Sequence, residues 1–220
     1  REPTAIGRAQ LVFATDDTIV AVATPPGHGG IGVVRLSGPK AQAIAEVLLG
    51  RTRLEPRMAT LATLLQTVAG DTERIDQVLA TSFPGPSSYT GEDVVELSAH
   101  GSPVVLEGIV DAAMRAGARL AEPGEFTFRG FLNGRIDLVQ AEAVADLVNA
   151  VTPLQARLAY DQLDGTLSTA IRAIDATLFD LIARLEASLD FPDEGYHFID
   201  RDQAATAIGS ITERLEALLS

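Results

Sequence analysis

Residues 24–38 have the sequence TPPGHGGIGVVRLSG, a glycine-rich stretch with apolar runs at both ends. The first run covers residues 18–23 (TIVAVA) and the second covers residues 31–36 (IGVVRL). Both are rich in β-branched residues, which predicts two strands joined by the glycine-rich loop. The second strand carries Arg35, and a guanidinium on an apolar strand is costly unless a partner satisfies it. The identity of that partner is the central question about this fold.

The glycines of the loop also match a nucleotide-binding pattern. Gly27, Gly29 and Gly32 have the spacing G-x-G-x-x-G, which binds a dinucleotide only where a helix opens directly behind it. Here a strand is predicted behind it, and Pro25 and Pro26 make the entry rigid and extended. We therefore interpret the glycines as positions where the backbone closely approaches a neighbouring segment or a ligand.

The composition limits the kinds of function that this chain can have. It has 220 residues, 46% of them hydrophobic, and a formal net charge of -13, which disfavours binding to nucleic acid. There is no cysteine, and the three histidines (His28, His100 and His197) lack ligand-like spacing, so a zinc site is not expected. No apolar run is long enough to span a membrane, and no signal peptide is recognisable, which favours a cytoplasmic protein.

Mixed strands and helices are predicted up to about residue 134, after a poorly specified leader in residues 1–16. One helix begins after a cap at Ser37 or Gly38, with Ile44, Val47 and Leu48 inward, and ends near Gly50. A second helix begins at residues 102–103 with Val105, Ile109 and Ala113 inward. Further strands are expected in the first part of residues 58–68 and in residues 75–83, 93–97 and 119–121.

Helical spacing replaces the strand pattern from about Glu125. Residues 17–134 and 135–220 therefore form two predicted domains, and the fold class is α+β, a mixed α/β domain followed by an all-α domain. One helix has Leu138, Ala141, Ala145 and Val148 on a shared face, and the next follows Thr152 and Pro153 with a possible break at Gly165. A heptad-like seam then covers residues 167–189, Phe191 and Pro192 stop it, and a last helix covers residues 204–219.

That last helix has no stop signal, so the chain is expected to be a fragment of a longer helical domain. In that case Leu181 and Leu185 lose packing partners, and residues 166–220 are predicted to be loosened or swapped.

Candidate binding residues lie beside turns in the first domain. Glu96 is predicted on the strand face opposite Val95, and a carboxylate beside valine on a core-facing side needs donors. Arg35 and Glu96 could simply pair with each other across the sheet, as buried ion pairs do in many non-catalytic proteins. His100 is interpreted as a capping or packing residue. The chain contains no G-x-x-x-x-G-K-[ST] phosphate loop.

Nine ordered segments give the sequence a specific resemblance. The chain resembles the N-terminal region of the MnmE (TrmE) family of tRNA uridine modification GTPases from about Asp17 to about Glu194. The segments are DTIVA (17–21), TPPG (24–27), RLSG (35–38), YTGED (89–93), PGEF (123–126), FLNG (131–134), DL (137–138), AEA (141–143) and DFPDE (190–194).

The resemblance implies a folate-binding α/β domain, similar to the folate site of aminomethyltransferases, that also forms the homodimer. It implies a helical domain into which a GTPase domain is inserted, and potassium, magnesium and GTP would belong to that inserted domain. It also implies a flavoprotein partner of the GidA (MnmG) type. Together they would place an aminomethyl-type group on C5 of the wobble uridine of tRNA.

Carried over residue by residue, the family's folate contacts fall on Arg35, Glu96 and Arg135. The expected ligand is 5-formyl- or 5,10-methylene-tetrahydrofolate, whose pterin N–H groups suit a carboxylate and whose carbonyl and carboxylate groups suit arginine. His28, Ala99 and Ser102 depart from the residues common in the family and could weaken this binding.

We therefore expect a folate-binding, dimerising portion of a tRNA-modifying GTPase that does not itself hydrolyse GTP or bind tRNA strongly. The alternatives are a dimerisation scaffold whose folate pocket does not function and a stand-alone folate-dependent aminomethyltransferase. A saturable calorimetric response to 5-formyltetrahydrofolate would separate a working pocket from a scaffold.

Overall fold

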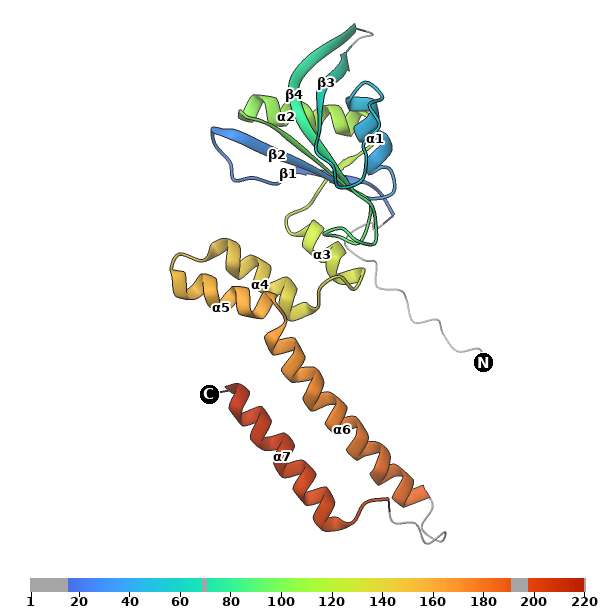
Figure 1. Cartoon of the computed structure of the whole chain (residues 1–220), viewed down its shortest axis with the longest axis vertical. Helices are drawn as coiled ribbons and strands as arrows, with labels where there is room; N and C mark the ends of the chain where they lie inside the picture. The colour runs from blue at the N-terminus through green and yellow to red at the C-terminus, as the bar shows by residue number, and fades with distance from the viewer. Residues whose placement is uncertain (1–15, 69–70, 191–197, 220) are drawn as a thin grey trace, which may run out of the picture. The chain divides into compact units, whose positions relative to one another are not determined.

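The structure is a computed structural model that describes residues 16–68, 71–190 and 198–219. It divides into two units with the boundary between Ile136 and Asp137, and each unit is described by itself. The first is a six-stranded sheet with helices, and the second is helical in its described residues (Figure 1). The predicted fold class, a mixed α/β domain followed by a helical domain, is therefore confirmed.

The sheet of the first unit has the strand order β3-β4-β5-β2-β1-β6. Neighbouring strands are antiparallel, except that β6 runs parallel to β1. The strands are β1 (Ile19–Val22), β2 (Gly29–Ser37), β3 (Thr60–Val68), β4 (Asp71–Phe83), β5 (Val94–Gly101) and β6 (Arg119–Leu120). The two predicted apolar runs thus become the β1–β2 hairpin, and the strand behind the loop excludes the dinucleotide interpretation.

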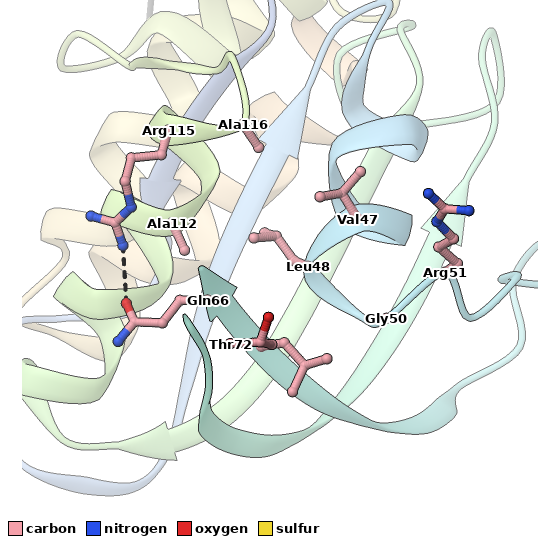
Figure 2. Close-up of a pocket in the computed structure, with 10 residues that line it drawn as sticks. Val47, Leu48, Gly50, Arg51, Gln66, Thr72, Ala112, Arg115 and Ala116 are labelled. Atoms are coloured by element: carbon pink, nitrogen blue, oxygen red, sulfur yellow. Dashed lines mark hydrogen bonds between the residues drawn. The ribbon is translucent and has the colours of Figure 1, made fainter. Parts of the chain in front are cut away.

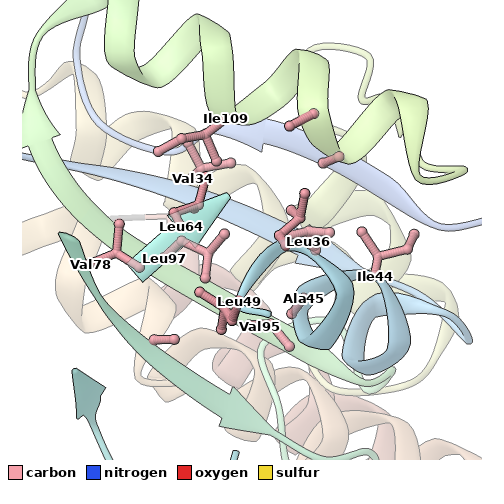
Figure 3. Close-up of a cluster of buried hydrophobic side chains, with 14 of the residues drawn as sticks. Val34, Leu36, Ile44, Ala45, Leu49, Leu64, Val78, Val95, Leu97 and Ile109 are labelled. Carbon is pink, nitrogen blue, oxygen red and sulfur yellow. The ribbon is translucent and has the colours of Figure 1, made fainter. Parts of the chain in front are cut away.

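Helices α1 (Ala41–Leu48) and α2 (Pro103–Arg115) pack on one face of this sheet and close the hydrophobic core (Figure 3). Alternate residues of the strands point toward these helices, as the period of two requires. Members of the core include Val34, Leu36, Ile44, Ala45, Leu64, Val78, Val95, Leu97 and Ile109.

The opposite face of the sheet carries two rows of side chains in register. One row crosses four strands as Leu61, Leu79, Ser98 and Val33. The neighbouring row crosses four strands as Thr81, Glu96, Arg35 and Ala21. Leu61 and Leu79 are 62% and 47% exposed, so this face is far more open than the helix-covered one. Glu96 lies opposite Val95, as predicted, but on the open face rather than on the core-facing side.

Several predicted boundaries in this unit need correction. Helix α1 begins at Ala41 after Lys40, not at a cap on Ser37 or Gly38, because Gly38 has φ 130° and Ser37 still pairs in β2. Val47 is exposed rather than inward, since only Ala41, Ile44, Ala45 and Leu48 of this helix are buried. Strands β3, β4 and β5 are longer than predicted, because the pairing continues through polar residues.

The glycine-rich loop makes one close backbone approach within the sheet. A Cβ built on Gly101 of β5 would lie 2.6 Å from the carbonyl oxygen of Gly29 on β2. The register of these two strands also shifts between Gly29 and Gly32. Gly101 therefore allows the strands to meet closely where the ladder is irregular. Of the loop glycines, Gly32 is the one that is closely packed, since a Cβ there would lie 2.5 Å from Leu106 Cδ1, whereas a Cβ on Gly27 would meet nothing within 4 Å.

The second unit contains α4 (Leu138–Asn149), α5 (Pro153–Leu163), α6 (Thr166–Asp190) and α7 (Arg201–Leu219). Capping boxes begin the first two: Asp137 with Gln140, and Thr152 with Gln155. Gly165, with φ 90°, separates α5 from α6, as predicted. No helix among the described residues combines the length and hydropathy needed to cross a membrane.

The predicted apolar faces of this unit are only partly correct. Leu138 and Val148 are exposed, and Ala143 is the buried residue of α4. Leu181 keeps a packing partner, because it forms a small core with Ile174 and with Ile211 of α7. Leu185 is partly exposed, and the predicted stop at Phe191 and Pro192 and the leader up to residue 15 lie outside the described residues.

Candidate functional site

The partner of Arg35 is Glu96, on the neighbouring strand. Arg35 Nε donates to Glu96 Oε1 at 2.9 Å, and Arg35 Nη2 lies 2.7 Å from the same oxygen. Strand register causes this pairing, since the two residues stand directly opposite each other on β2 and β5. Their side chains are 24% and 29% exposed, so the pair is accessible to solvent on the open face, on the two central strands of the sheet. The expected cross-sheet ion pair is therefore present.

Two aromatic rings flank the Arg35 guanidinium. Its Cζ lies 4.9 Å from the ring centroid of Tyr89 and 5.7 Å from that of Phe126. Both distances fall within the range of cation–π interaction. Tyr89 is held in place by a 2.9 Å hydrogen bond between its hydroxyl and Thr127 Oγ1 on α3 (Glu125–Leu132).

A cavity of about 360 Å³ opens beside these rings. Arg35, Tyr89, Phe126 and Thr127 line it, together with the β1 segment 21–23 and the loop 121–124. Its volume lies at the lower end of the range for small-molecule sites. A guanidinium between aromatic rings beside an apolar strand suits a flat, polar heteroaromatic ligand.

The three predicted site residues do not all meet in this cavity. Arg35 lines it, and Glu96 reaches it only through its pairing with Arg35. Arg135 lies one loop away, where its Nε donates to the Ser88 carbonyl at 3.1 Å. Ser88 precedes Tyr89, so Arg135 supports the loop that carries one of the two rings.

A buried ionic network holds α3 against the sheet and therefore positions Phe126. Arg129 is 1% exposed, and its Nη2 lies 3.0 Å from Oε1 of Glu125, whose side chain is fully buried. Arg129 Nη1 also lies 3.2 Å from Glu92 Oε1 and donates to the Asp17 carbonyl at 2.8 Å. Arg119 completes the network, with its guanidinium 2.6 Å from both Asp17 and Glu125.

The network favours the ionised forms of Asp17 and Glu125 in spite of burial. Burial favours the neutral form of Glu125, but hydrogen bonds from Arg119, the Glu122 N–H and Arg129 outweigh it and lower the pKa of Glu125. Burial likewise opposes ionisation of Asp17, and hydrogen bonds from Arg119 and Arg129 reverse the balance and lower its pKa. These bonds raise the pKa of Arg129 against the effect of its own burial. The cluster is therefore a charged ion-pair network that fixes the position of α3.

Sequence reasoning did not assign a role to Tyr89, Phe126 or Arg129. Tyr89 and Phe126 belong to segments 89–93 and 123–126, each beside a glycine-containing turn, and that position was the available signal. Nothing in the spacing of Arg129 indicates burial, because its partners are as far as 112 residues away in the chain. His100 was expected to be a capping or packing residue; its side chain is exposed, so it does not pack in the core, and its Nδ1 lies 2.8 Å from Asp76 Oδ1.

The three residues that depart from the family pattern lie outside this cavity. His28 is exposed in the loop between β1 and β2, Ala99 is buried in the core, and Ser102 precedes α2. None of them is among the residues that line the Arg35 cavity.

Comparison with known proteins accounts for both units. Residues 18–135 match the family model described as the GTP-binding protein TrmE N-terminus, and residues 138–220 match the MnmE helical domain. A protein named tRNA modification GTPase MnmE from Legionella pneumophila (strain Paris) is 48% identical over 204 residues, which cover 93% of this chain and 45% of that protein. A protein of the same name from Koribacter versatilis is 48% identical, over 92% of this chain and 45% of that protein. Another from Nitrosomonas eutropha is 47% identical, over 93% of this chain and 45% of that protein.

The chain spans about half the length of the curated relatives that it matches. Within that span it has both the N-terminal α/β unit and the helical segment of those relatives. The chain belongs to the tRNA modification GTPase MnmE family.

Proposed function

We propose that the α/β unit binds a tetrahydrofolate derivative in the cavity beside Arg35, as part of a tRNA-modifying GTPase. One observation carries the proposal: an arginine on the open sheet face is flanked by Tyr89 and Phe126 and paired with an accessible carboxylate. A pterin is flat, has an edge of adjacent N–H donors and a carbonyl, and so suits the rings and both charged groups.

The size of the cavity limits how the ligand is held. About 360 Å³ accommodates the bicyclic head and leaves the glutamate tail outside. In this arrangement Glu96 accepts from the pterin N–H groups and Arg35 donates to the carbonyl. Arg135, which does not line the cavity, would contact the part of the ligand that extends outside it. Tetrahydrofolate would supply the one-carbon unit for the modification, as 5-formyl- or 5,10-methylene-tetrahydrofolate.

The Arg35–Glu96 ion pair does not prevent this binding. Both side chains are partly exposed, and such pairs stabilise a fold by about 0–1 kcal/mol. Hydrogen bonds to a charged group in a site closed by ligand are worth about 1.5–3 kcal/mol each. The pair therefore keeps both groups satisfied in the empty site and opens at little cost when a ligand enters.

We also propose that the unit forms a homodimer through the open face of its sheet. Leu61 and Leu79 are adjacent across β3 and β4 on this face and are substantially exposed. A second copy would bury these two leucines, as expected for neighbouring exposed apolar side chains at an interface.

The activity of the complete protein is inferred from the family. The curated relatives are named as GTPases, and the chain contains no phosphate-binding loop motif, so GTP, magnesium and potassium would bind in a domain outside this chain. A flavoprotein of the GidA (MnmG) type would act with it to place an aminomethyl-type group on C5 of the wobble uridine. The acidic charge of this chain is consistent with tRNA contacting other surfaces, in a cytoplasmic enzyme.

Calorimetric titration of the chain with 5-formyltetrahydrofolate tests the proposal against its main rival. One saturable site per chain is expected. Absence of heat at ligand concentrations up to the millimolar range would favour a dimerisation scaffold without a functional pocket. A stand-alone aminomethyltransferase is less favoured, because half of the relatives' length lies outside this chain.

A further inference from the structure

A second and larger cavity lies at the C-terminal ends of α1 and α2, beside strands β3 and β4 (Figure 2). Its volume is about 580 Å³, within the usual range for small-molecule sites. It shares no lining residue with the Arg35 cavity. Leu48, Arg51, Gln66, Ala112 and Arg115 are among the residues that line it.

The floor of this cavity is apolar and its charged lining groups are both cations. Leu48 and Ala112 are buried in the core and form part of the floor. Arg51 follows α1 and Arg115 ends α2, and Figure 2 shows them on opposite sides of Leu48. Two arginines around an apolar floor are unusual on a chain with a net charge of -13. This combination suits an anion with an apolar body.

The guanidinium of Arg115 is oriented by a relay of hydrogen bonds. Arg115 Nη2 donates to Gln66 Oε1 at 3.0 Å (Figure 2). Gln66 Nε2 in turn donates to Glu73 Oε2 at 3.4 Å. A guanidinium has five N–H donors, so this bond leaves capacity for the oxygens of a ligand. Because the Arg115 side chain is already oriented before a ligand binds, less conformational entropy is lost on binding.

The backbone at Arg51 provides an independent observation. Gly50 and Arg51 both have left-handed conformations, with φ of 62° and 65°. Glycine adopts this conformation without strain, but arginine does not. Hydrogen bonds from Arg51 N to Glu46 O and from Thr52 N to Leu49 O fix the turn. This turn ends α1 and places Arg51 in the lining of the cavity, at the energetic cost that a left-handed arginine carries.

We propose that this cavity is a second binding site, for small organic anions that combine a carboxylate or phosphate with a compact apolar body. The apolar body packs on Leu48 and Ala112, and the anionic group accepts hydrogen bonds from Arg115, while Arg51 on the opposite side adds positive charge to the lining. This site shares no residue with the Arg35 cavity, so the proposal does not depend on folate binding there.

The test is an NMR titration of the uniformly ¹⁵N-labelled chain with 1-naphthyl phosphate. The amides of Gly50, Gln66 and Ala116 are expected to shift with one saturable dissociation constant. The uncharged naphthalene-1-methanol is expected to bind at least about tenfold more weakly, because it lacks the charge-assisted hydrogen bonds. Shifts confined to other regions, including Ala21 and Gly124 of the folate cavity, would overturn the proposal.

Variants separate a ligand-binding role from a structural one. Arg51→Gly relieves the backbone strain, so it is expected to raise the melting temperature while weakening 1-naphthyl phosphate binding about tenfold. Arg115→Gln is expected to weaken binding to a similar extent. Arg53→Gln is the matched control, because Arg53 is exposed nearby but does not line the cavity. Equal affinity in the wild-type chain and the Arg51→Gly, Arg115→Gln double variant would also overturn the proposal.

Discussion

Arg35 and Glu96 stand directly opposite each other on β2 and β5, with Arg35 Nη2 2.7 Å from Glu96 Oε1. The pair lies on the sheet face that α1 and α2 do not cover, and Tyr89 and Phe126 flank its guanidinium. This single cross-strand contact connects the glycine-rich hairpin to the proposed function. It satisfies the charge of the arginine in the absence of ligand and presents a donor and an acceptor together.

The ring of Tyr89 is expected to contribute to ligand binding by stacking. Tyr89→Leu removes the ring beside Arg35 and should weaken 5-formyltetrahydrofolate binding about tenfold, as expected for the loss of about 1.4 kcal/mol of aromatic contact. Tyr89→Phe is the control, because it keeps the ring and removes only the hydrogen bond to Thr127. Calorimetry should show near-normal affinity for Tyr89→Phe, and an equal loss in both variants would exclude stacking as the cause.

The buried ionic network around Arg129 is expected to contribute most of the stability of the α3 region. Glu125→Gln removes the carboxylate that both Arg119 and Arg129 contact, so it should lower the free energy of unfolding by about 3 kcal/mol. The nearby exposed Glu122→Gln should change it by less than about 0.5 kcal/mol. Urea denaturation monitored by circular dichroism measures both, and similar values for the two variants would contradict a structural role for the network.

The same network determines how this stability depends on pH. The pKa values of Asp17 and Glu125 are lowered in the folded state from ordinary values of 3.8 and 4.5. Their contribution is therefore complete above the ordinary values and is lost as the pH falls through the lowered ones. Denaturation repeated between pH 6 and about pH 2 should show the difference between the wild-type chain and Glu125→Gln decreasing below about pH 4.5. A difference that grows on acidification would contradict this assignment.

Much of this architecture could be predicted from local sequence. β-Branched runs around TPPGHGG predicted the first hairpin, and residues 102–103 predicted the start of α2. The predicted start of α1, at a cap on Ser37 or Gly38, was wrong. The chain makes a left-handed turn at Gly38, so the helix begins only at Ala41, and residue preferences for helix caps do not indicate such a turn. The predicted buried face of α4 was also wrong, because the helix buries Ala143 and leaves the larger Leu138 and Val148 exposed.

The site was predictable only in part, because its contacts join distant segments. Arg35 and Glu96 could be selected as charged residues on apolar strands, and register then brings them together. The rings and the buried arginine could not be placed, since Tyr89 and Phe126 converge on Arg35 from a loop and a helix over 50 residues away in sequence. Arg135 was predicted as a folate contact only from the family resemblance, and in the structure its Nε donates a hydrogen bond to the Ser88 carbonyl.

Gly101 is expected to tolerate no side chain. Gly101→Ala would place a Cβ 2.6 Å from the Gly29 carbonyl oxygen, so β2 and β5 must separate at a cost of about 2 kcal/mol. Gly30→Ala is the matched control in the same hairpin, because a Cβ there meets nothing within 4 Å. Thermal denaturation should show a lower melting temperature for Gly101→Ala alone. Equal melting temperatures would show that the close approach is not required.

The open sheet face is expected to form the dimer. Leu79→Glu places a charge in the exposed apolar row and should convert a dimer, of twice the 23.2 kDa chain mass, into monomers. Val104→Glu is the control, since Val104 is 79% exposed on α2, away from that row. Analytical ultracentrifugation measures the mass, and a Leu79→Glu variant that remains dimeric would place the interface elsewhere.

The most direct test of the central claim is calorimetric titration of the wild-type, Arg35→Ala and Glu96→Ala chains with 5-formyltetrahydrofolate. Thr81→Ala is the control, because Thr81 lies beside Glu96 in the same cross-strand row. We predict one site per chain in the wild type and in the control, and at least about tenfold weaker binding in each charge variant. Unchanged affinity in both Arg35→Ala and Glu96→Ala would contradict the claim that this pair forms the ligand site.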